Sequence, residues 1–434
     1  MKLTRIILSS AILATSLPAM ADPWSLDSCI NYAVEHNLDV RSALLERQRG
    51  DLNVTEAKDR FLPNVSASAS QSWNFGRGLT SENTYANRNT SSFGWGANLS
   101  LPIFQGLSAL RQLRQARANV RDLDLRVEYA RDETTLSIMS YYLQALYNKE
   151  LLSVRREELN LSRAQLARQE ALLEGGKIPE VDVLQAKSQV ASGEVSVINA
   201  ENDYRLAMVD LTRALELDNT EGFDILPLDM DKEFPTLASP ESVYNNALEN
   251  YSGIRVARSA IGLADHAISI AKSGYLPQLS FSAGLNSSYY TLSGVPGASF
   301  SRQMRDNFSK SLGFSLSIPI FNAFNTRNQI RQAKLQRLNA ELELERRESD
   351  LNKTIQQAYC QAQGAEARYK AGETAVVAAK AALDAMTEKS IYGRANSTEW
   401  EQARTNYITT LSEQVQAKYE MILRNRILNF YNKR

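Results

Sequence analysis

An internal repeat constrains the fold of this chain more than any other feature of its 434 residues. The segment 61–66 (FLPNVS) matches 275–280 (YLPQLS), and 99–104 (LSLPIF) matches 316–321 (LSIPIF). Gly176 to Ala186 then matches Gly393 to Ala403, again 217 residues later. Because the matches keep the same order in both halves, the sequence indicates a tandem duplication of one structural unit.

The sequence of each repeat predicts the same series of elements, in the order helix, strand, loop, strand, long helix, turn and helix. The strands are expected at about 64–75 and 91–101 in the first repeat, and at about 278–290 and 309–318 in the second. In all four, apolar residues alternate with Ser, Gly, Asn and Gln. Alternation over about ten residues is typical of membrane barrel strands, with the apolar side outward. A small soluble β-sandwich is the alternative, although the long polar loops at about 74–92 and 290–308 favour a barrel.

Long helices are expected over the rest of each repeat. No proline interrupts the stretch from Ile103 to about Leu173, where apolar or small residues recur at the three-four spacing of a coiled-coil seam. Its counterpart starts at Phe321. Return helices at about 180–216 and 397–430 complete two hairpins, at about 103–215 and 320–430. The repeats thus cover 22–215 and 239–434, joined by a linker at 216–238.

The N-terminus indicates export. Lys2 and Arg5 precede an apolar stretch, and Ala19-Met20-Ala21 is a small-x-small cleavage site, so residues 1–21 are expected to be a signal peptide. No later stretch approaches the roughly 18 to 20 apolar residues of a membrane helix. The mature chain is therefore expected to be periplasmic or secreted, or to enter a membrane as strands.

Composition excludes several classes of function. Without Lys2 and Arg5 the chain has 47 basic and 49 acidic residues, which offers no case for nucleic-acid binding. Cys29 and Cys360 are too few for a disulfide framework, and the chain has two histidines. With no metal-ligand cluster, phosphate loop or Ser/His/Asp set, we expect no cofactor and no enzyme activity.

Four strands cannot close a membrane barrel, because the smallest known barrels need about eight. An open sheet in lipid leaves backbone groups unpaired, at several kcal/mol for each group. If these strands cross a membrane, copies of the chain must therefore join. Two, three or four copies would each supply enough strands.

At this point the repeated series, including Arg114-Gln-Ala and Asp182-Val-Leu, resembles the TolC-like outer membrane efflux family over about residues 24–430. The resemblance implies a mainly α fold with a membrane β-barrel, built by a homotrimer. Three copies of four strands and four helices would give a 12-strand β-barrel in the outer membrane and a 12-helix α-barrel in the periplasm, with the linker in an equatorial region. It also implies a passive exit duct, for efflux or type I secretion, that docks an inner-membrane pump through a periplasmic adaptor.

The resemblance also implies site residues. The hairpin tips, 172–179 and 389–396, are expected to close the periplasmic entrance and to contact the adaptor. The residues expected there are Leu173, Gly176, Lys177, Tyr392, Gly393 and Arg394. The family's pore constriction has acids three residues apart, which correspond here to Glu399 and Gln402, with Glu401 beside them. Three like charges in a trimer would favour cations.

Purely structural interpretations remain open for these residues. Helix capping explains the tip glycines equally well, and a solvated helix face explains Glu401. Asp182, in the first tip, could pair with Lys177 or Arg394. For the whole chain, the alternative is a periplasmic adaptor-like hairpin protein without channel activity, although no lipoyl-like β-domain is found between the helices. The sequence does not predict the exported substrate.

Overall fold

The computed structural model describes residues 23–79, 83–87, 89–219, 222–228, 238–293, 295–392 and 396–433. The predicted signal peptide and part of the predicted linker lie outside these residues. The chain forms two compact units, each drawn from both halves of the sequence. One comprises residues up to Ser42 with Ala130–Tyr251 and Asp350–Arg434, and the other comprises Ala43–Tyr129 and Ser252–Ser349. The division into sequence repeats at 215 and 239 stays a prediction.

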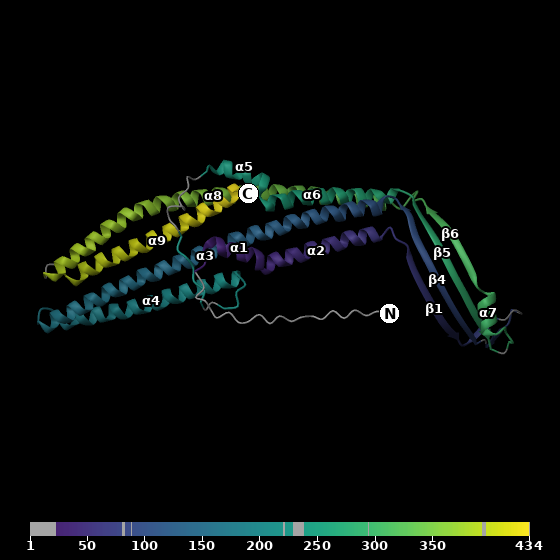
Figure 1. The fold of residues 1–434 in the computed structure, drawn as a ribbon, viewed down its shortest axis with the longest axis horizontal. Helices are drawn as coiled ribbons and strands as arrows, with labels where there is room; N and C mark the ends of the chain where they lie inside the picture. The colour runs from purple at the N-terminus through teal and green to yellow at the C-terminus, as the bar shows by residue number, and fades with distance from the viewer. Residues whose placement is uncertain are drawn as a thin grey trace, which may run out of the picture. The chain divides into compact units, whose positions relative to one another are not determined.

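A four-stranded antiparallel sheet forms one end of the second unit (Figure 1). Its strands are β1 (Asn64–Asn74), β4 (Thr90–Gln105), β5 (Gln278–Leu292) and β6 (Ser309–Ser317), in the order β1-β4-β5-β6. The bounds agree with the predicted strands within two residues, except that β4 continues to Gln105. β1 and β6 are the two edges of this sheet.

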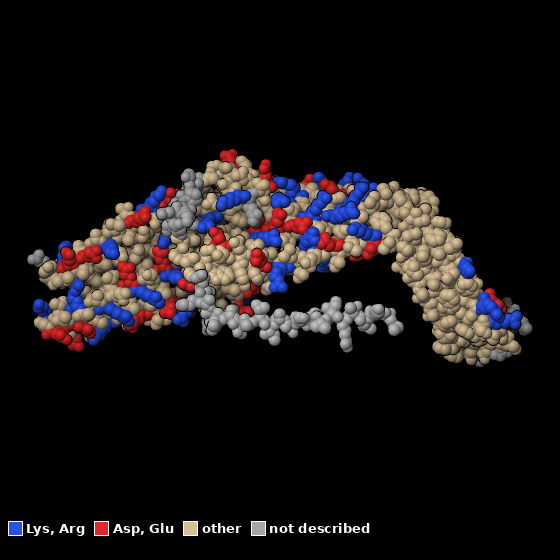
Figure 2. All heavy atoms as spheres, in the orientation of Figure 1, with Lys and Arg blue, Asp and Glu red and all other residues tan. Residues whose placement is uncertain are grey.

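The apolar side chains of the edge strands face outward without cover. Val65 on β1 is 69% exposed, and Leu312 and Phe314 on β6 are 79% and 72% exposed. The four strands contain a single charged residue, Lys310, and the sheet is nearly free of charge on the face seen in Figure 2. A soluble sandwich would bury such a face under a second sheet, but none covers it within the described residues.

The loops predicted at 74–92 and 290–308 contain short elements. β2 (Arg77–Leu79) pairs with β3 (Tyr85–Asn87), and α7 (Phe300–Asp306) lies against β5. The side chain of Gln303 fixes α7 by accepting from the amide of Tyr290 and donating to its carbonyl, both at 3.0 Å. Elements of three and seven residues are too short to produce a recognisable period in the sequence.

The long helices begin later than predicted. α3 (Ser108–Glu174) starts five residues after Ile103, and α8 (Asn325–Ile391) starts four residues after Phe321. Left-handed backbone precedes each helix, at Gly106 and Leu107 (φ 59° and 63°) and at Ala323 and Phe324 (φ 51° and 62°). These residues turn the chain from strand to helix. The sequence does not reveal such a turn, because its apolar residues keep helical spacing through it.

The remaining helices complete the two units. Before β1 the chain forms α1 (Leu26–His36) and α2 (Leu38–Asp59), and before β5 it forms α5 (Pro240–Asn250), α6 (Ser252–Ala271) and the 3₁₀ turn η2 (Lys272–Tyr275). One helix was predicted at each place, but non-helical backbone at Asn37 and Tyr251 divides it in two. α4 (Glu180–Ala214) and α9 (Ser397–Lys433) are the return helices.

The core of the first unit lies where α1, α3, α4 and α9 meet. Cys29, Tyr142, Leu211 and Ile422 are fully buried in it. The hydroxyl of Tyr142 lies 2.7 Å from the carbonyl oxygen of Leu226, to which it donates. Cys29 and Cys360 are free thiols. Among the described residues, none of the helices combines the length and apolarity that crossing a membrane requires.

Replacing Gly106 by alanine should destabilise the sheet-bearing unit. An added Cβ would lie 2.8 Å from the carbonyl oxygen of Ser273, and left-handed backbone costs an L-residue about 1–2 kcal/mol more. As a control, Gly262→Ala on α6 has open space and should gain about 1 kcal/mol of helix propensity. Thermal unfolding in detergent should therefore show a lower Tm for Gly106→Ala and a higher one for Gly262→Ala. An unchanged Tm for Gly106→Ala would contradict this account.

Candidate functional site at the hairpin tips

The first tip is a tightly capped helix end. α3 stops at Glu174, and Gly176 adopts left-handed backbone with φ 65°. The amide of Lys177 donates to Leu172 at 2.9 Å and that of Gly176 donates to Leu173 at 2.8 Å. This is the Schellman pattern, which satisfies the last carbonyls of a helix. A Cβ on Gly176 would meet nothing within 4 Å, so the backbone conformation alone requires glycine.

Asp182 lies in the first turn of α4, where its charge is favourable to the helix dipole. Its amide donates to the carbonyl of Pro179, the N-cap residue, at 3.2 Å. The side chain makes no ion pair with Lys177 or with any other described residue. Arg394, the other predicted partner, lies outside the described residues together with Gly393.

The second tip opens α9 with a capping box. The side chain of Asn396 accepts from the amide of Glu399 at 2.7 Å, and the carboxylate of Glu399 accepts from the amide of Asn396 at 3.1 Å. This reciprocal pair satisfies two amides that the helix start leaves free. Glu399 and Gln402 are both exposed, and Tyr392 before the turn is 77% exposed.

Trp400 joins the two helices of the second hairpin just above the tip. The indole is 3% exposed, and its Nε1 donates to the hydroxyl of Thr387 on α8 at 2.9 Å. The sequence analysis did not single out this residue. A tryptophan one position after the acid of an Asn-x-x-Glu capping box is a signal that could have found it, because a buried indole needs a partner near the helix start.

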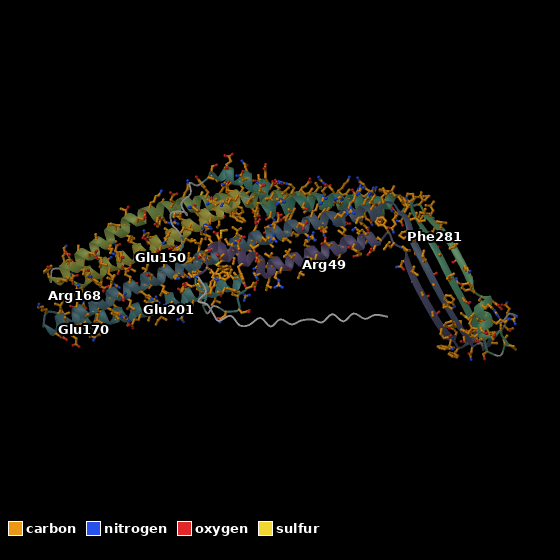
Figure 3. All side chains as sticks on the ribbon, in the orientation of Figure 1. Arg49, Glu150, Arg168, Glu170, Glu201 and Phe281 are labelled. Carbon is orange, nitrogen blue, oxygen red and sulfur yellow. The ribbon has the colours of Figure 1, made fainter. Side chains whose placement is uncertain are left out.

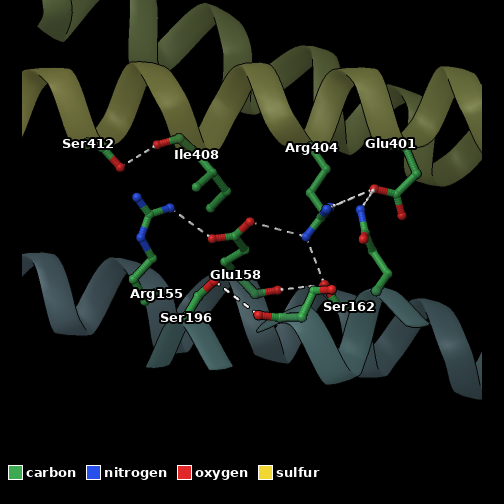
Figure 4. A network of polar contacts seen from close by, with 10 residues as sticks. Arg155, Glu158, Ser162, Ser196, Glu401, Arg404, Ile408 and Ser412 are labelled. Carbon is green, nitrogen blue, oxygen red and sulfur yellow. Dashed lines mark hydrogen bonds and ion pairs between the residues drawn. The ribbon is translucent and has the colours of Figure 1, made fainter. Parts of the chain in front are cut away.

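The side chain of Glu401 is bonded to other residues rather than only to solvent. It forms an ion pair with Arg404 at 2.8 Å, and it accepts from the amide nitrogen of Gln189 on α4 at 3.2 Å. Arg404, with 5% of its side chain exposed, also donates to Ser162 at 2.8 Å and approaches Glu158 at 3.5 Å (Figure 4). Arg404 thus joins α9 to α3, and its ion-pair partner Glu401 joins α9 to α4.

Further contacts continue this connection along one face of α9. We call Ser397, Glu401, Arg404, Tyr407 and Lys418 the α9 contact line, because each of them bonds to a residue of the first hairpin. Ser397 accepts from Gln169 at 3.1 Å, Tyr407 donates to Glu157 at 2.8 Å, and Lys418 lies 2.8 Å from Glu150, which is labelled in Figure 3. All these bonds lie within the first compact unit.

Burial and the bond to Glu157 raise the pKa of Tyr407 to about 12. The phenol therefore remains a protonated donor at neutral pH. Because the pKa is raised, the stability that it contributes is present below pH 10 and is lost as the pH rises towards 12.

The side chains at the tips are those of a contact surface between helices. The described residues contain no group of three or more His, Cys, Asp and Glu side chains arranged to hold a metal ion. What the tips offer is capped turns, exposed apolar and charged side chains, and buried polar bonds between two helical hairpins. Such an arrangement can hold two hairpins together and release them.

Comparison with known proteins agrees with this geometry. The family model of outer membrane efflux proteins matches residues 29–216 and 243–429. The efflux protein BepC of Brucella suis biovar 1 is 22% identical over 417 residues, covering 96% of this chain and 86% of BepC. The outer membrane protein TolC of Escherichia coli K12 is 23% identical, covering 89% of this chain and 78% of TolC.

The fold is likewise shared with solved structures. CusC, whose crystal structures concern transmembrane channel formation, superposes with a TM-score of 0.78 at 16% identity and covers 94% of this chain and 91% of CusC. These findings confirm the predicted resemblance and the outer-membrane location, and with them an outer-membrane exit duct. The chain belongs to the outer membrane efflux protein family.

Proposed function

We propose that the protein works as a homotrimeric exit duct whose sheet joins those of two other copies in a 12-strand β-barrel. The observation that carries this proposal is the four-stranded sheet with β1 and β6 at open edges and apolar side chains uncovered. Pairing β1 of one copy with β6 of the next satisfies both edges and turns one face towards lipid. The serine-rich face then lines a water-filled lumen, and the long helices continue it as a 12-helix periplasmic barrel.

The hairpin tips are the surface that we assign to a periplasmic adaptor and, through it, to an inner-membrane pump. Val181 and Leu184 on α4, Ile391 at the end of α8 and Tyr392 just after it are all more than half exposed close to the tips. Apolar side chains at helix ends suit a protein partner better than water. The duct would pass small molecules or proteins from that complex across the outer membrane. The adaptor-like alternative leaves the apolar sheet without a role.

Glu399 is the residue that we assign to the constriction of the duct. It is exposed at the start of α9, whereas Glu401 is engaged by Arg404 and Gln189. With glutamine at position 402, the ring in a trimer would consist of one exposed carboxylate from each chain, that of Glu399. Three such charges near the axis attract cations and repel anions.

The α9 contact line is the part that we assign to holding the tips closed. It bonds α9 to α3 and α4, so the second hairpin cannot swing outward while these bonds remain. A docked partner would favour opening if it bound the separated hairpins more tightly than the joined ones. Asp182, Lys177, Leu173 and Gly176 then form the neighbouring tip that such a partner meets.

Neutralising the constriction tests the duct itself. Glu399→Gln retains an oxygen for the capping box and removes the charge, so we expect higher conductance and a weaker preference for cations in planar bilayers. Glu388→Gln is the matched control, because this acid is exposed on α8 before the tip and lies outside the proposed ring. If the Glu399→Gln reversal potential equals that of the wild type, Glu399 has no part in the constriction. If the wild-type protein forms no channel, the duct itself is contradicted.

Removing the central bond tests the contact line. Arg404→Ala leaves the partly buried Glu401 without its cation and Glu158 with Arg155 alone, and breaking a buried pair in this way costs about 3–5 kcal/mol. Arg163→Ala breaks an exposed pair with Glu194 between α3 and α4, which is worth about 0–1 kcal/mol. We expect a lower Tm in detergent and larger bilayer currents for Arg404→Ala alone. Equal behaviour of the two variants would contradict a closing role for Arg404.

A further inference from the structure

Six exposed cations lie where the two long helices leave the sheet. β4 ends three residues before α3 begins, and β6 ends eight residues before α8 begins. Within the first four turns of each helix, three exposed basic residues follow one another at spacings of three and four, which places them on one helix face. We call this set the basic collar: Arg114, Arg117 and Arg121 on α3, and Arg327, Arg331 and Lys334 on α8.

The basic collar is not explained by its own helices. Cations are unfavourable in the first turn of a helix, where the macrodipole is positive, and Arg327 lies in the first turn of α8, which has no acidic residue. By contrast, Lys58 lies in the last turn of α2 and Lys272 in the last turn of η2, where the negative end of the helix dipole favours a cation. The starts of these two helices thus supply no negative charge to offset the collar.

None of the six collar residues forms an ion pair within the described part of the chain. Arg327 is the one that has a described side-chain contact, with its guanidinium 4.1 Å from the ring centre of Phe324. A little farther along, the pattern changes. Arg126 pairs with Asp122 at 2.6 Å, and Arg337 pairs with Asp265 at 2.8 Å. The collar thus groups six unpaired cations in the turns nearest to the sheet, although unpaired cations also occur elsewhere, for example Lys353 and Lys380 on α8.

An exposed apolar band lies between the main part of the sheet and the basic collar in both repeats, and in the first repeat it includes the last residues of β4. Its members occupy equivalent positions, 217 residues apart, and each is at least 38% exposed, with Ile320 at 94%. They are Ile103, Phe104 and Leu107 before α3, and Ile320, Phe321 and Phe324 before α8. Arg114 and Arg331 are likewise equivalent, as are Arg117 and Lys334. The duplicated unit therefore carries the same order twice: uncharged sheet, apolar band, cations.

That order matches the depth profile of one membrane leaflet, with hydrocarbon first and headgroups next. We propose that the basic collar binds anionic phospholipid headgroups in the leaflet of the outer membrane that faces the periplasm. The inference rests on the proposed function, in which the sheet crosses that membrane. Guanidinium groups pair with phosphate in a forked geometry, which suits the arginines that occupy five of the six collar positions. The headgroups supply the negative charge that the helix starts lack.

Lipid retention by the full-length protein tests this inference. The protein is placed in nanodiscs of phosphatidylcholine with a minor share of phosphatidylglycerol, and the lipids that remain bound are identified by native mass spectrometry. The test variant carries Arg117→Gln, Arg331→Gln and Lys334→Gln. The matched control carries Arg41→Gln, Lys353→Gln and Lys380→Gln, three exposed cations without ion pairs within the described residues and away from the sheet. A third variant, with Arg117→Lys and Arg331→Lys, keeps the charge.

Wild type and control should retain phosphatidylglycerol above its bulk share. The test variant should lose this enrichment by about fivefold for each headgroup contact removed, and added salt should do the same. The lysine variant should retain most of it. Equal retention by the test variant and the wild type would overturn the inference, as would an equal loss in the control.

Two further outcomes separate this inference from others. A test variant that keeps its phosphatidylglycerol but loses its assembly would show that the collar faces an acidic surface of a second copy, which overturns lipid binding. Wild-type protein that enters nanodiscs without lipid preference overturns this inference and leaves the exit duct intact. Protein that does not enter bilayers at all overturns both.

Discussion

The unpaired edges of β1 and β6 are the constraint on which the rest of the structure depends. Each edge carries backbone donors and acceptors that water can satisfy and lipid cannot. Because the apolar side chains of these strands are uncovered as well, a single chain is not a finished structure in the outer membrane. Closure by other copies explains the open edges, the uncovered apolar face and the polar, serine-rich alternate face together.

The helices impose a second requirement, because the two long hairpins of the first unit must be held to one another. Ordinary apolar packing does this in the core around Tyr142 and Leu211. Near the tips the connection becomes polar, through Arg404, Glu158 and Glu401. A buried ion pair adds little net stability over apolar packing, but it is costly to break on one side only. Such bonds suit a contact between two hairpins that is either fully formed or fully broken, rather than loosely packed.

The sequence predicted the sheet well because period-two alternation is local and is set by the two environments that its faces meet. It also predicted turns at both hairpin tips, because Gly176 is typical of a helix C-terminus and Asn396 of a helix N-terminus. It missed the left-handed residues Leu107 and Phe324, because apolar spacing runs on through those turns. Arg404 was missed for a different reason: its burial depends on Glu158 and Ser162, which are more than 240 residues away in the chain.

The same distinction applies to the candidate constriction. The sequence assigned Glu399 to the constriction by resemblance and left Glu401 beside it, and the partners of Glu401, Arg404 on α9 and Gln189 on α4, separate the two acids. The central claim remains the closure of the sheet by copies of the chain. Native mass spectrometry of the full-length protein in detergent measures it most directly. The account predicts an assembly of three chains, whereas a stable single chain, or an assembly of two or four, would contradict it.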